Sequence, residues 1–349
     1  MQGCVIGGVD THKEFHCAAA LDETGRLLGT EEFSTTKQGI KDLEQWLESF
    51  GEVAAVGVEG TGSYGAELTR RLHAAGTKVL EVPRPNRQGR RRYGKSDPID
   101  AEAAARSVLN GQAKIVPKLG SSQIENIRTL RVARQGALKA KIAATNALKS
   151  MVVTAPGGLR DQLRYRSTQQ LIASCRAFRV LGADPCDPLQ GTKLACKYLA
   201  QRIYHLNEEI DALDAHLETL VTQVAPHTLR VFGMGVETVA ALLVAVGDNP
   251  ERLMSDASFA RLCGVAPIPA SSGKVNRYRL HRGGVRDANS ALHVAVIVRL
   301  RYCTKTKAYM QRRTSEGLSK MEVIRCLKRY LVREVLRSLR SDYKNLLKV

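Results

Sequence analysis

Apolar and polar positions along the first hundred residues alternate between strand-like and helix-like segments. Residues 4–10 (CVIGGVD) and 53–59 (VAAVGVE) are short apolar runs that each end at a carboxylate, a pattern typical of buried strands. Residues 15–33 predict a strand hairpin whose polar turn spans Asp22 to Arg26. Three strands therefore come before the first helical segment.

Helical spacing begins after this hairpin. Ile40, Leu43 and Leu47 recur three and four residues apart, and residues 66–76 form a second helical segment that Gly76 closes. Residues 97–111 are rich in alanine and end at glycine, which indicates another helix. The order β-β-β-α-β-α-β-α resembles the ribonuclease-H-like fold, a mixed α/β sheet with helices on its faces.

The remaining residues predict an all-α region. A long helix is expected over residues 121–153, and Gly233 and Gly235 form a turn before a helix that is similar to a helix-hairpin-helix element. Between them lies a heptad pattern, compatible with packing inside one subunit, with the preceding helix or with another subunit. Its members are Leu199, Ile203, Leu206, Ile210, Leu213, Leu217, Leu220 and Val224.

Positive charge is concentrated in two parts of the chain. The net charge of +19 divides into −5 for residues 1–80, +10 for 81–150, −1 for 151–270 and +15 for 271–349. This distribution indicates a polyanionic partner, and nucleic acid fits better than an anionic membrane. The expected nucleic-acid contacts are Arg90, Arg91, Arg92, Lys274, Arg277, Arg279 and Arg282.

The chain shows no targeting or membrane signal. Its N-terminus has no basic leader, and no stretch approaches 18 apolar residues. We therefore expect a cytoplasmic bacterial protein that lies on the nucleoid when bound to DNA.

Four acidic residues stand where a sheet-based nuclease needs them. Asp10 and Glu59 end the first and fourth strands, which are neighbours in a ribonuclease-H-like sheet, while Asp97 and Asp100 share one face of a helix. Two carboxylates about 4 Å apart repel by about 4 kcal/mol at an effective dielectric near 20. Such a cluster is best explained as a Mg²⁺ site, with two ions expected and Mn²⁺ able to substitute.

Several separated motifs resemble one protein family. They are GVDTHK, VEGTGSYG, KSDPIDAEAAARSVL, GMGVETVAALLVAVGD and SSGKVNRYRLHRGGVRDANSALH. Together they are similar to the insertion-sequence family called one-ten, transposases related to the Piv DNA invertase. The resemblance runs in order over nearly the whole chain, apart from about residues 155–198.

This resemblance implies three domains and a site divided between two of them. A RuvC-like domain (1–115) would hold the acidic set Asp10, Glu59, Asp97 and Asp100, followed by a helical coiled-coil region (116–225) and a transposase domain (226–349). The family's nucleophilic serine falls on Ser272, or on Ser271 if the register shifts by one residue. Attack by this serine would leave DNA attached as a phosphoserine ester, with no need for ATP.

The resemblance further implies target and donor DNA as partners, guidance by a structured bridge RNA, and a homo-oligomer, either a dimer or a tetramer in the synaptic complex. The acidic domain of one subunit would face the serine domain of another. Arg277, Arg279 and Arg282 would hold the DNA backbone, and Lys274 would stabilise developing charge.

Alternative functions remain open at the level of the sequence. A junction nuclease could use the same carboxylates with water as nucleophile, and a site-specific invertase could act without guide RNA. An actin-like ATPase would need a second glycine-rich phosphate loop, which is not evident. In a non-catalytic RNA-binding protein, the acidic set would be incidental.

Overall fold

The computed structural model describes residues 3–82, 96–120, 122–179, 187–272, 278–279 and 281–346. The chain divides into two compact units, each described by itself. The N-terminal unit comprises Met1–Ser122 and the short segment Val246–Glu251, and the C-terminal unit comprises Gln123–Ala245 and Arg252–Val349. The three-domain division at residues 115 and 225 stays a prediction.

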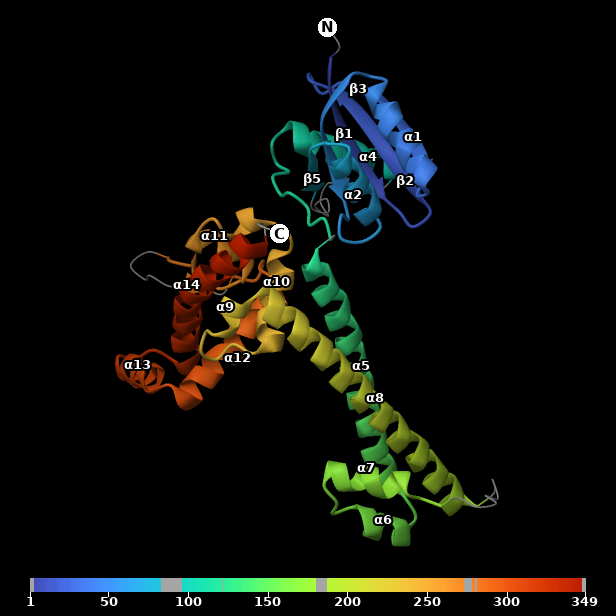
Figure 1. The fold of residues 1–349 in the computed structure, drawn as a ribbon, viewed down its shortest axis with the longest axis vertical. Helices are drawn as coiled ribbons and strands as arrows, with labels where there is room; N and C mark the ends of the chain where they lie inside the picture. The colour runs from blue at the N-terminus through green and yellow to red at the C-terminus, as the bar shows by residue number, and fades with distance from the viewer. Residues whose placement is uncertain are drawn as a thin grey trace. The chain divides into compact units, whose positions relative to one another are not determined.

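The N-terminal unit is a five-stranded mixed sheet with helices on both faces (Figure 1). Strands β1 and β2 and strands β2 and β3 are antiparallel, whereas β4 is parallel to both β1 and β5. The strand order is β3-β2-β1-β4-β5, so the first and fourth strands are neighbours as predicted. The elements are β1 (Cys4–Thr11), β2 (Phe15–Asp22), β3 (Leu27–Ser34), α1 (Lys37–Glu48), β4 (Glu52–Glu59), α2 (Ala66–Ala74), β5 (Val79–Val82) and α4 (Asp97–Leu109).

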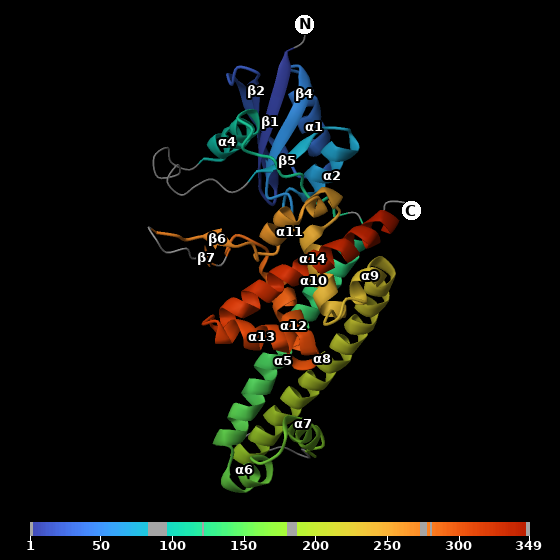
Figure 2. The same ribbon diagram turned by 90° about the vertical axis from the view of Figure 1, so that its left-hand side faces the viewer.

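Helices α1 and α2 cover one face of this sheet and α4 covers the other (Figure 2). On the α1 face, Ile40, Leu43 and Leu47 are buried against the strands, which confirms their predicted role. Trp46, the single tryptophan of the chain, packs beside this core between Phe33 and Phe50, with ring centroids 5.5 and 5.1 Å away. Its fluorescence therefore reports on the N-terminal unit.

Helix α4 lies directly on the strand backbone because small residues meet there. A Cβ atom added at Gly8 of β1 would lie 2.2 Å from the Ala105 backbone nitrogen and 2.3 Å from the Ala101 carbonyl oxygen. A Cβ atom at Gly57 of β4 would lie 2.8 Å from the carbonyl oxygen of Ala104. Only glycine leaves room for a helix at this distance.

A long antiparallel helical hairpin begins the C-terminal unit. Helix α8 packs along α5, and Ile203, Ile210 and Leu217 are buried at successive heptads. Ala137 and Ala144 are buried on α5, also seven residues apart, and their small side chains let the helices approach closely. The elements are α5 (Gln123–Thr154), α6 (Gly157–Leu163), α7 (Thr168–Arg176) and α8 (Pro188–Val224).

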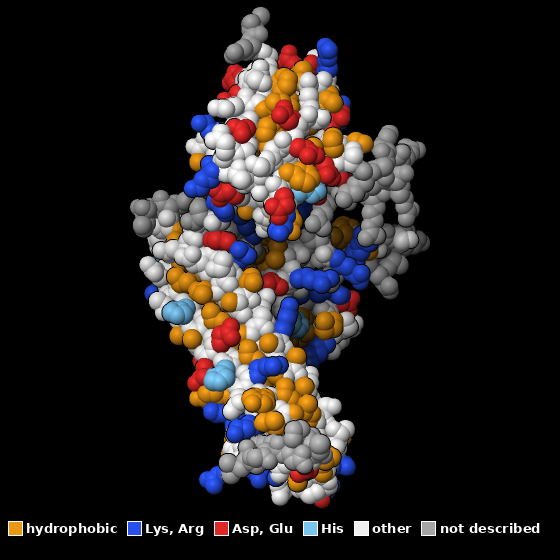
Figure 3. All heavy atoms as spheres, turned by 90° about the vertical axis from the view of Figure 1, so that its right-hand side faces the viewer, with side chains coloured by type: hydrophobic (Ala, Val, Ile, Leu, Met, Phe, Trp, Pro, Cys, Tyr) orange, Lys and Arg blue, Asp and Glu red, His pale blue; other side chains and the backbone are white. Residues whose placement is uncertain are grey.

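The heptad helix therefore packs on the preceding helix, one of the three arrangements that the sequence left open. A supercoiled arrangement or a contact with another subunit stays a prediction. Val132, Ile142 and Val153 of α5 are each more than half exposed. Figure 3 shows apolar side chains among Lys and Arg side chains in its lower part, where this hairpin is drawn.

The rest of the C-terminal unit is a cluster of helices around α14. Buried Asp342 on α14 accepts hydrogen bonds from the backbone nitrogens of His227 and Thr228 (2.9 and 3.0 Å), which secures the start of α9. Buried Arg131 of α5 pairs with Glu237 of α10 at 2.7 Å. The elements are α9 (Pro226–Leu229), α10 (Val236–Val246), the 3-10 turn η1 (Pro250–Leu253), α11 (Asp256–Leu262), β6 (Ile268–Pro269), β7 (Tyr278–Arg279), α12 (Arg286–Tyr302), α13 (Thr304–Ser315) and α14 (Lys320–Leu346).

In the turn before α10, packing against a neighbouring helix requires glycine at the first of the two glycine positions. Gly233 has φ +88°, and a Cβ atom there would lie 2.8 Å from the carbonyl oxygen of Ala295 on α12. A Cβ atom at Gly235 would meet nothing within 4 Å. The helix-hairpin-helix interpretation of this turn stays a prediction.

Among the described residues, no helix is long and apolar enough to cross a membrane.

The contact between α4 and the sheet gives a stability prediction. The methyl group of Gly8→Ala would overlap backbone atoms of α4. Overpacking of this kind lowers the free energy of unfolding by about 1–3 kcal/mol. We expect the urea midpoint reported by Trp46 fluorescence to fall. Gly62→Ala is the matched control, since nothing lies within 4 Å of its added Cβ atom, and it should change stability by less than about 0.5 kcal/mol. Equal midpoints for the two variants would contradict the prediction.

Candidate active site

Asp10, near the end of strand β1, lies on the face of the sheet that α4 covers. Successive side chains alternate between the faces of a strand, so Asp10 lies on the same face as Gly8, against which α4 packs. Asp10 is buried and lies opposite Cys17 of β2. A carboxylate in this position has little water around it and needs compensation from neighbouring groups.

Helix α4 brings two further carboxylates to the same end of the sheet. Asp97 is the first residue of α4, and buried Asp100 follows one turn later. Both positions are in the first turn, where the positive end of the helix dipole favours negative charge. The predicted shared face of Asp97 and Asp100 therefore points toward the end of β1.

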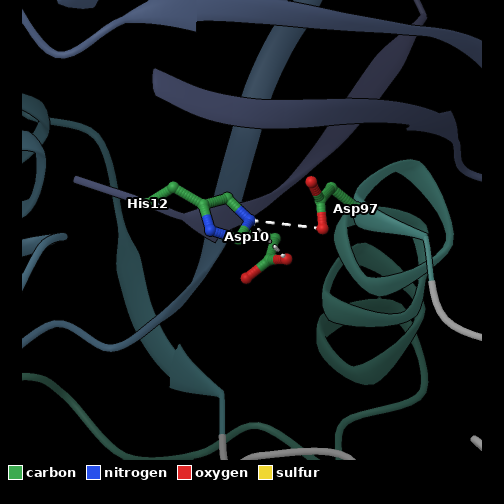
Figure 4. Close-up of side chains that lie close together, drawn as sticks. All are labelled: Asp10, His12 and Asp97. Atoms are coloured by element: carbon green, nitrogen blue, oxygen red, sulfur yellow. Dashed lines mark ion pairs between the residues drawn. The ribbon is translucent and has the colours of Figure 1, made fainter. Parts of the chain in front are cut away.

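His12 lies between the carboxylates of the strand and of the helix (Figure 4). Its Nε2 atom is 3.2 Å from Asp10 Oδ2 and 3.3 Å from Asp97 Oδ1. The Nε2 atom is buried and makes no hydrogen bond of normal angle within the described part of the chain. The imidazole nitrogen and the two carboxylates are thus within 4.8 Å of one another.

Glu59 ends β4, the strand beside β1. The register pairs Val9 with Val58, so Glu59 follows next to the Asp10 position, and the Thr11 hydroxyl donates to the Glu59 carbonyl oxygen at 2.8 Å. Alternation along β4 puts Glu59 on the same face as Gly57, which α4 covers. All four predicted acidic residues therefore belong to one end and one face of the sheet.

The carboxylates influence one another electrostatically. Burial raises the pKa of Asp10, and the charges of Asp100 and Asp97 raise it further, while His12 opposes this effect. Burial also raises the pKa of Cys17 to about 11, with Glu32, Asp97 and Asp10 adding to the shift. The Cys17 thiol is therefore protonated at neutral pH and is not a nucleophile.

This chemistry fits a divalent cation. Clustered carboxylate oxygens are the ligands of Mg²⁺ and Mn²⁺, and an imidazole nitrogen suits Mn²⁺ better than Mg²⁺. The buried Nε2 atom of His12, which faces two carboxylates without a regular hydrogen bond, is the arrangement expected of a ligand atom. Asp10, His12 and Asp97 could hold one ion, with Glu59 and Asp100 alongside.

The two candidate serines lie in the C-terminal unit. Ser271 and Ser272 are exposed and follow β6, which pairs with β7 through Ile268–Arg279 and Pro269–Tyr278. Of the predicted nucleic-acid contacts, Arg279 and Arg282 are exposed and line a cavity of about 560 Å³ with Ile268, His281 and Gly283. The other predicted contacts, Lys274, Arg277, Arg90, Arg91 and Arg92, lie outside the described residues.

His12 is the site residue that the sequence analysis missed. Part of the signal was available, because His12 follows Asp10 by two residues and, if β1 continued one residue beyond Thr11, both side chains would share one face. The pattern of a buried strand ends at Asp10, however, and the residues after it look like a polar turn. Only the position of α4 shows that the ring of His12 reaches a second carboxylate.

Comparisons with known proteins match both units. A family model of IS110 transposases with the DEDD acidic set, described as "Transposase", matches residues 7–155, and a second, "Transposase IS116/IS110/IS902 family", matches residues 227–311. The "Insertion element IS110 uncharacterized 43.6 kDa protein" of Streptomyces coelicolor is 27% identical over 146 residues. That match covers 41% of this chain and 36% of the relative, so it spans little more than a third of the relative's length. Taken together, the two family matches, which cover residues 7–155 and 227–311, and the similarity to the IS110 relative show that the chain belongs to the IS110 family of insertion-sequence transposases.

Proposed function

We propose that this chain is the DNA transposase of an insertion sequence, a recombinase that cuts and rejoins DNA strands. The observation that carries the proposal is the convergence of Asp10 and Asp97, with His12 between them, where β1 meets the start of α4. This end of the sheet belongs to the region that matches the transposase model. The strand order supports a ribonuclease-H-like, RuvC-like domain as its scaffold.

The acidic site would hold Mg²⁺, or Mn²⁺ in its place, through Asp10, Glu59, Asp97 and Asp100. When bound, the ions would polarise the phosphodiester and offset its negative charge. The role of the protein residues is to fix the carboxylates in a partly buried position before DNA arrives. His12 would orient Asp10 and Asp97 and provide a nitrogen ligand, which favours Mn²⁺.

Ser272 would be the nucleophile. Its Oγ atom forms a bond to phosphorus, the bond from phosphorus to one strand oxygen breaks, and that oxygen takes up a proton. The serine proton leaves to a base in the assembled site. Attack by the released strand end on the phosphoserine ester would rejoin DNA without ATP, and Arg279 and Arg282 would hold the backbone.

The serine and the acidic residues belong to different units of the chain. We propose that they are combined in a homodimer or tetramer, with the acidic unit of one subunit serving the serine of another. The exposed apolar side chains of the α5–α8 hairpin support a role of that element in assembly, including a coiled-coil contact. The turn at Gly233 would be a helix-hairpin-helix element near DNA.

A bridge RNA that pairs with target and donor DNA would select the sites. The strongly basic segment 271–349, with its charge of +15, suits a protein that contacts nucleic-acid backbones while base pairing reads sequence. The rival is a junction nuclease that uses the same metal site with water as nucleophile. Dependence on Ser272 distinguishes the two functions.

The raised pKa of Asp10 leads to a prediction about stability and metal. Because its folded-state pKa is above the ordinary value, the ionised carboxylate is less favourable in the folded chain than in the unfolded chain at neutral pH. Asp10→Asn should therefore raise the urea midpoint of the Trp46 transition in metal-free buffer. Mg²⁺ at a hundredfold excess over its Kd should stabilise the wild type by about 2.7 kcal/mol and Asp10→Asn far less.

Asp42→Asn is the matched control for this measurement. Asp42 is exposed on α1 of the same unit and should be neutral in both buffers. A metal response in Asp10→Asn equal to that of the wild type would remove Asp10 from the metal site. Asp10→Asn should in addition abolish strand cleavage and leave DNA binding nearly unchanged.

A covalent intermediate tests the nucleophile. A nicked DNA substrate that carries the element's junction should yield a denaturation-resistant protein–DNA adduct, and Ser272→Ala should eliminate it without loss of binding. Loss of a hydroxyl from this exposed position should change stability by less than about 0.5 kcal/mol. If Ser271→Ala instead eliminates the adduct, the register is wrong by one residue. Free DNA ends in both variants would identify a hydrolytic nuclease.

RNA guidance is tested by purification from cells that carry the whole element. We expect one structured RNA from its noncoding end to co-purify, and sequencing should find loops complementary to target and donor DNA. Altering a target-pairing loop should redirect insertion. Unchanged insertion sites, or recombination by the protein freed of RNA, would favour an invertase-like enzyme that acts at fixed sites.

A further inference from the structure

A basic groove lies in the C-terminal unit between β7 and α14. It encloses about 810 Å³, and apolar residues such as Val265, Pro267 and Leu318 contribute to its lining. All of α14 lies beyond residue 311, where the second family match ends. Its polar lining residues are Tyr278, Arg279, Glu322, Arg325, Lys328, Arg329, Tyr330 and Arg333.

Arginines outnumber acids around this groove. Arg325 pairs with Glu322 at 3.7 Å, and Arg333 reaches Asp256 at 3.2 Å. These are partly exposed pairs, which contribute little to stability, so a phosphate group can replace the carboxylate as the partner of the guanidinium. Lys328 differs, since it is buried and donates to Asn289 Oδ1 at 2.8 Å, and we assign it a structural role.

Two tyrosine rings lie in this cationic surface. Tyr278 is 64% exposed and Tyr330 is 53% exposed, although aromatic residues make up 5% of the chain. Tyr330 is held edge-on against Tyr309, with ring centroids 5.7 Å apart. Exposed aromatic rings within a positively charged groove are the combination by which proteins bind single strands, with bases stacked on rings and phosphates on cations.

A base can stack on tyrosine only when it is unpaired or displaced from its duplex, since bases within a duplex are already stacked on one another. Tyr278 lies opposite Pro269, which precedes Ser272 by three residues along the same hairpin. At 3.3 Å per residue, those three residues span at most about 10 Å. A base on Tyr278 would therefore belong to a nucleotide close to the phosphate that reaches the serine.

We propose that this groove binds an unpaired stretch of DNA, with bases stacked on Tyr278 and Tyr330 and phosphates held by Arg279, Arg325 and Arg333. The choice of DNA over RNA rests on the proposed function. Strand β7, which contributes Tyr278 and Arg279 to the groove, pairs with β6, the strand that precedes Ser272, and that serine would act on DNA. The DNA that reaches Ser272 would then be a locally unpaired strand instead of an intact duplex.

The test measures binding of the full chain to four fluorescent probes: a dT12 oligonucleotide, a dT12 analogue with abasic central positions, a 12-base-pair duplex and U12. Tyr278→Ala and Tyr330→Ala should each weaken dT12 binding about 5- to 150-fold, corresponding to about 1–3 kcal/mol per stacked base. The Phe variants should retain binding. The abasic probe should bind the wild type weakly and be insensitive to either Ala variant.

Tyr302→Ala is the matched control, because Tyr302 is 63% exposed on α12 and does not line the groove. The proposal is overturned if the tyrosine variants bind dT12 as Tyr302→Ala does, or if they lose duplex and dT12 binding equally. A larger loss for U12 than for dT12 would identify RNA as the occupant and overturn the DNA assignment. Formation of the covalent adduct at Ser272 is a separate measurement. A wrong assignment of the groove can therefore be distinguished from a wrong assignment of the serine nucleophile.

Discussion

The direct contact between the strand backbone and helix α4 determines where the acidic residues lie. At Gly8 and Gly57 the helix backbone takes the space that a side chain would occupy. This spacing brings the first turn of α4 to the end of β1, so Asp97 and Asp10 reach the same histidine. A bulkier sheet surface would lift the helix away, and the two carboxylates would separate.

The site that results is unfavourable for the isolated protein. Burial and like charge raise the pKa of Asp10, so the folded chain holds a charge that it would lose more readily than an exposed carboxylate. Two features compensate in part: His12 lies within 3.3 Å of two carboxylates, and the N-terminus of α4 favours negative charge. A titratable group whose pKa is shifted by burial and by neighbouring charges, within an otherwise stable sheet, is typical of functional sites.

Much of the N-terminal unit could be predicted because its patterns are local. Short continuous apolar runs identified β1 and β4, and the spacing of Ile40, Leu43 and Leu47 identified the buried side of α1. The pairing of β1 with β4 placed Asp10 beside Glu59. His12 could not be assigned in the same way, since its neighbour Asp97 is distant in sequence and depends on the packing of α4.

The C-terminal unit shows the limits of such patterns more clearly. A heptad repeat specifies which side of α8 is buried but not which helix covers it, and the covering helix is α5. Aromatic residues make up only 5% of the chain, yet two exposed tyrosines line one basic groove. Composition averages over the chain, whereas a binding surface depends on a few residues that folding brings together.

The acidic site also has a consequence for synthesis of the protein. Asp10 leaves the ribosome before its partners on α4, which follow only after all five strands of the sheet have been made. Because domains fold as the chain emerges, the growing sheet exists for a time without the two aspartates of α4. A chain released before α4 would hold Asp10 and Glu59 but neither aspartate of the helix, so under the proposed function a truncated product would lack half of the acidic set.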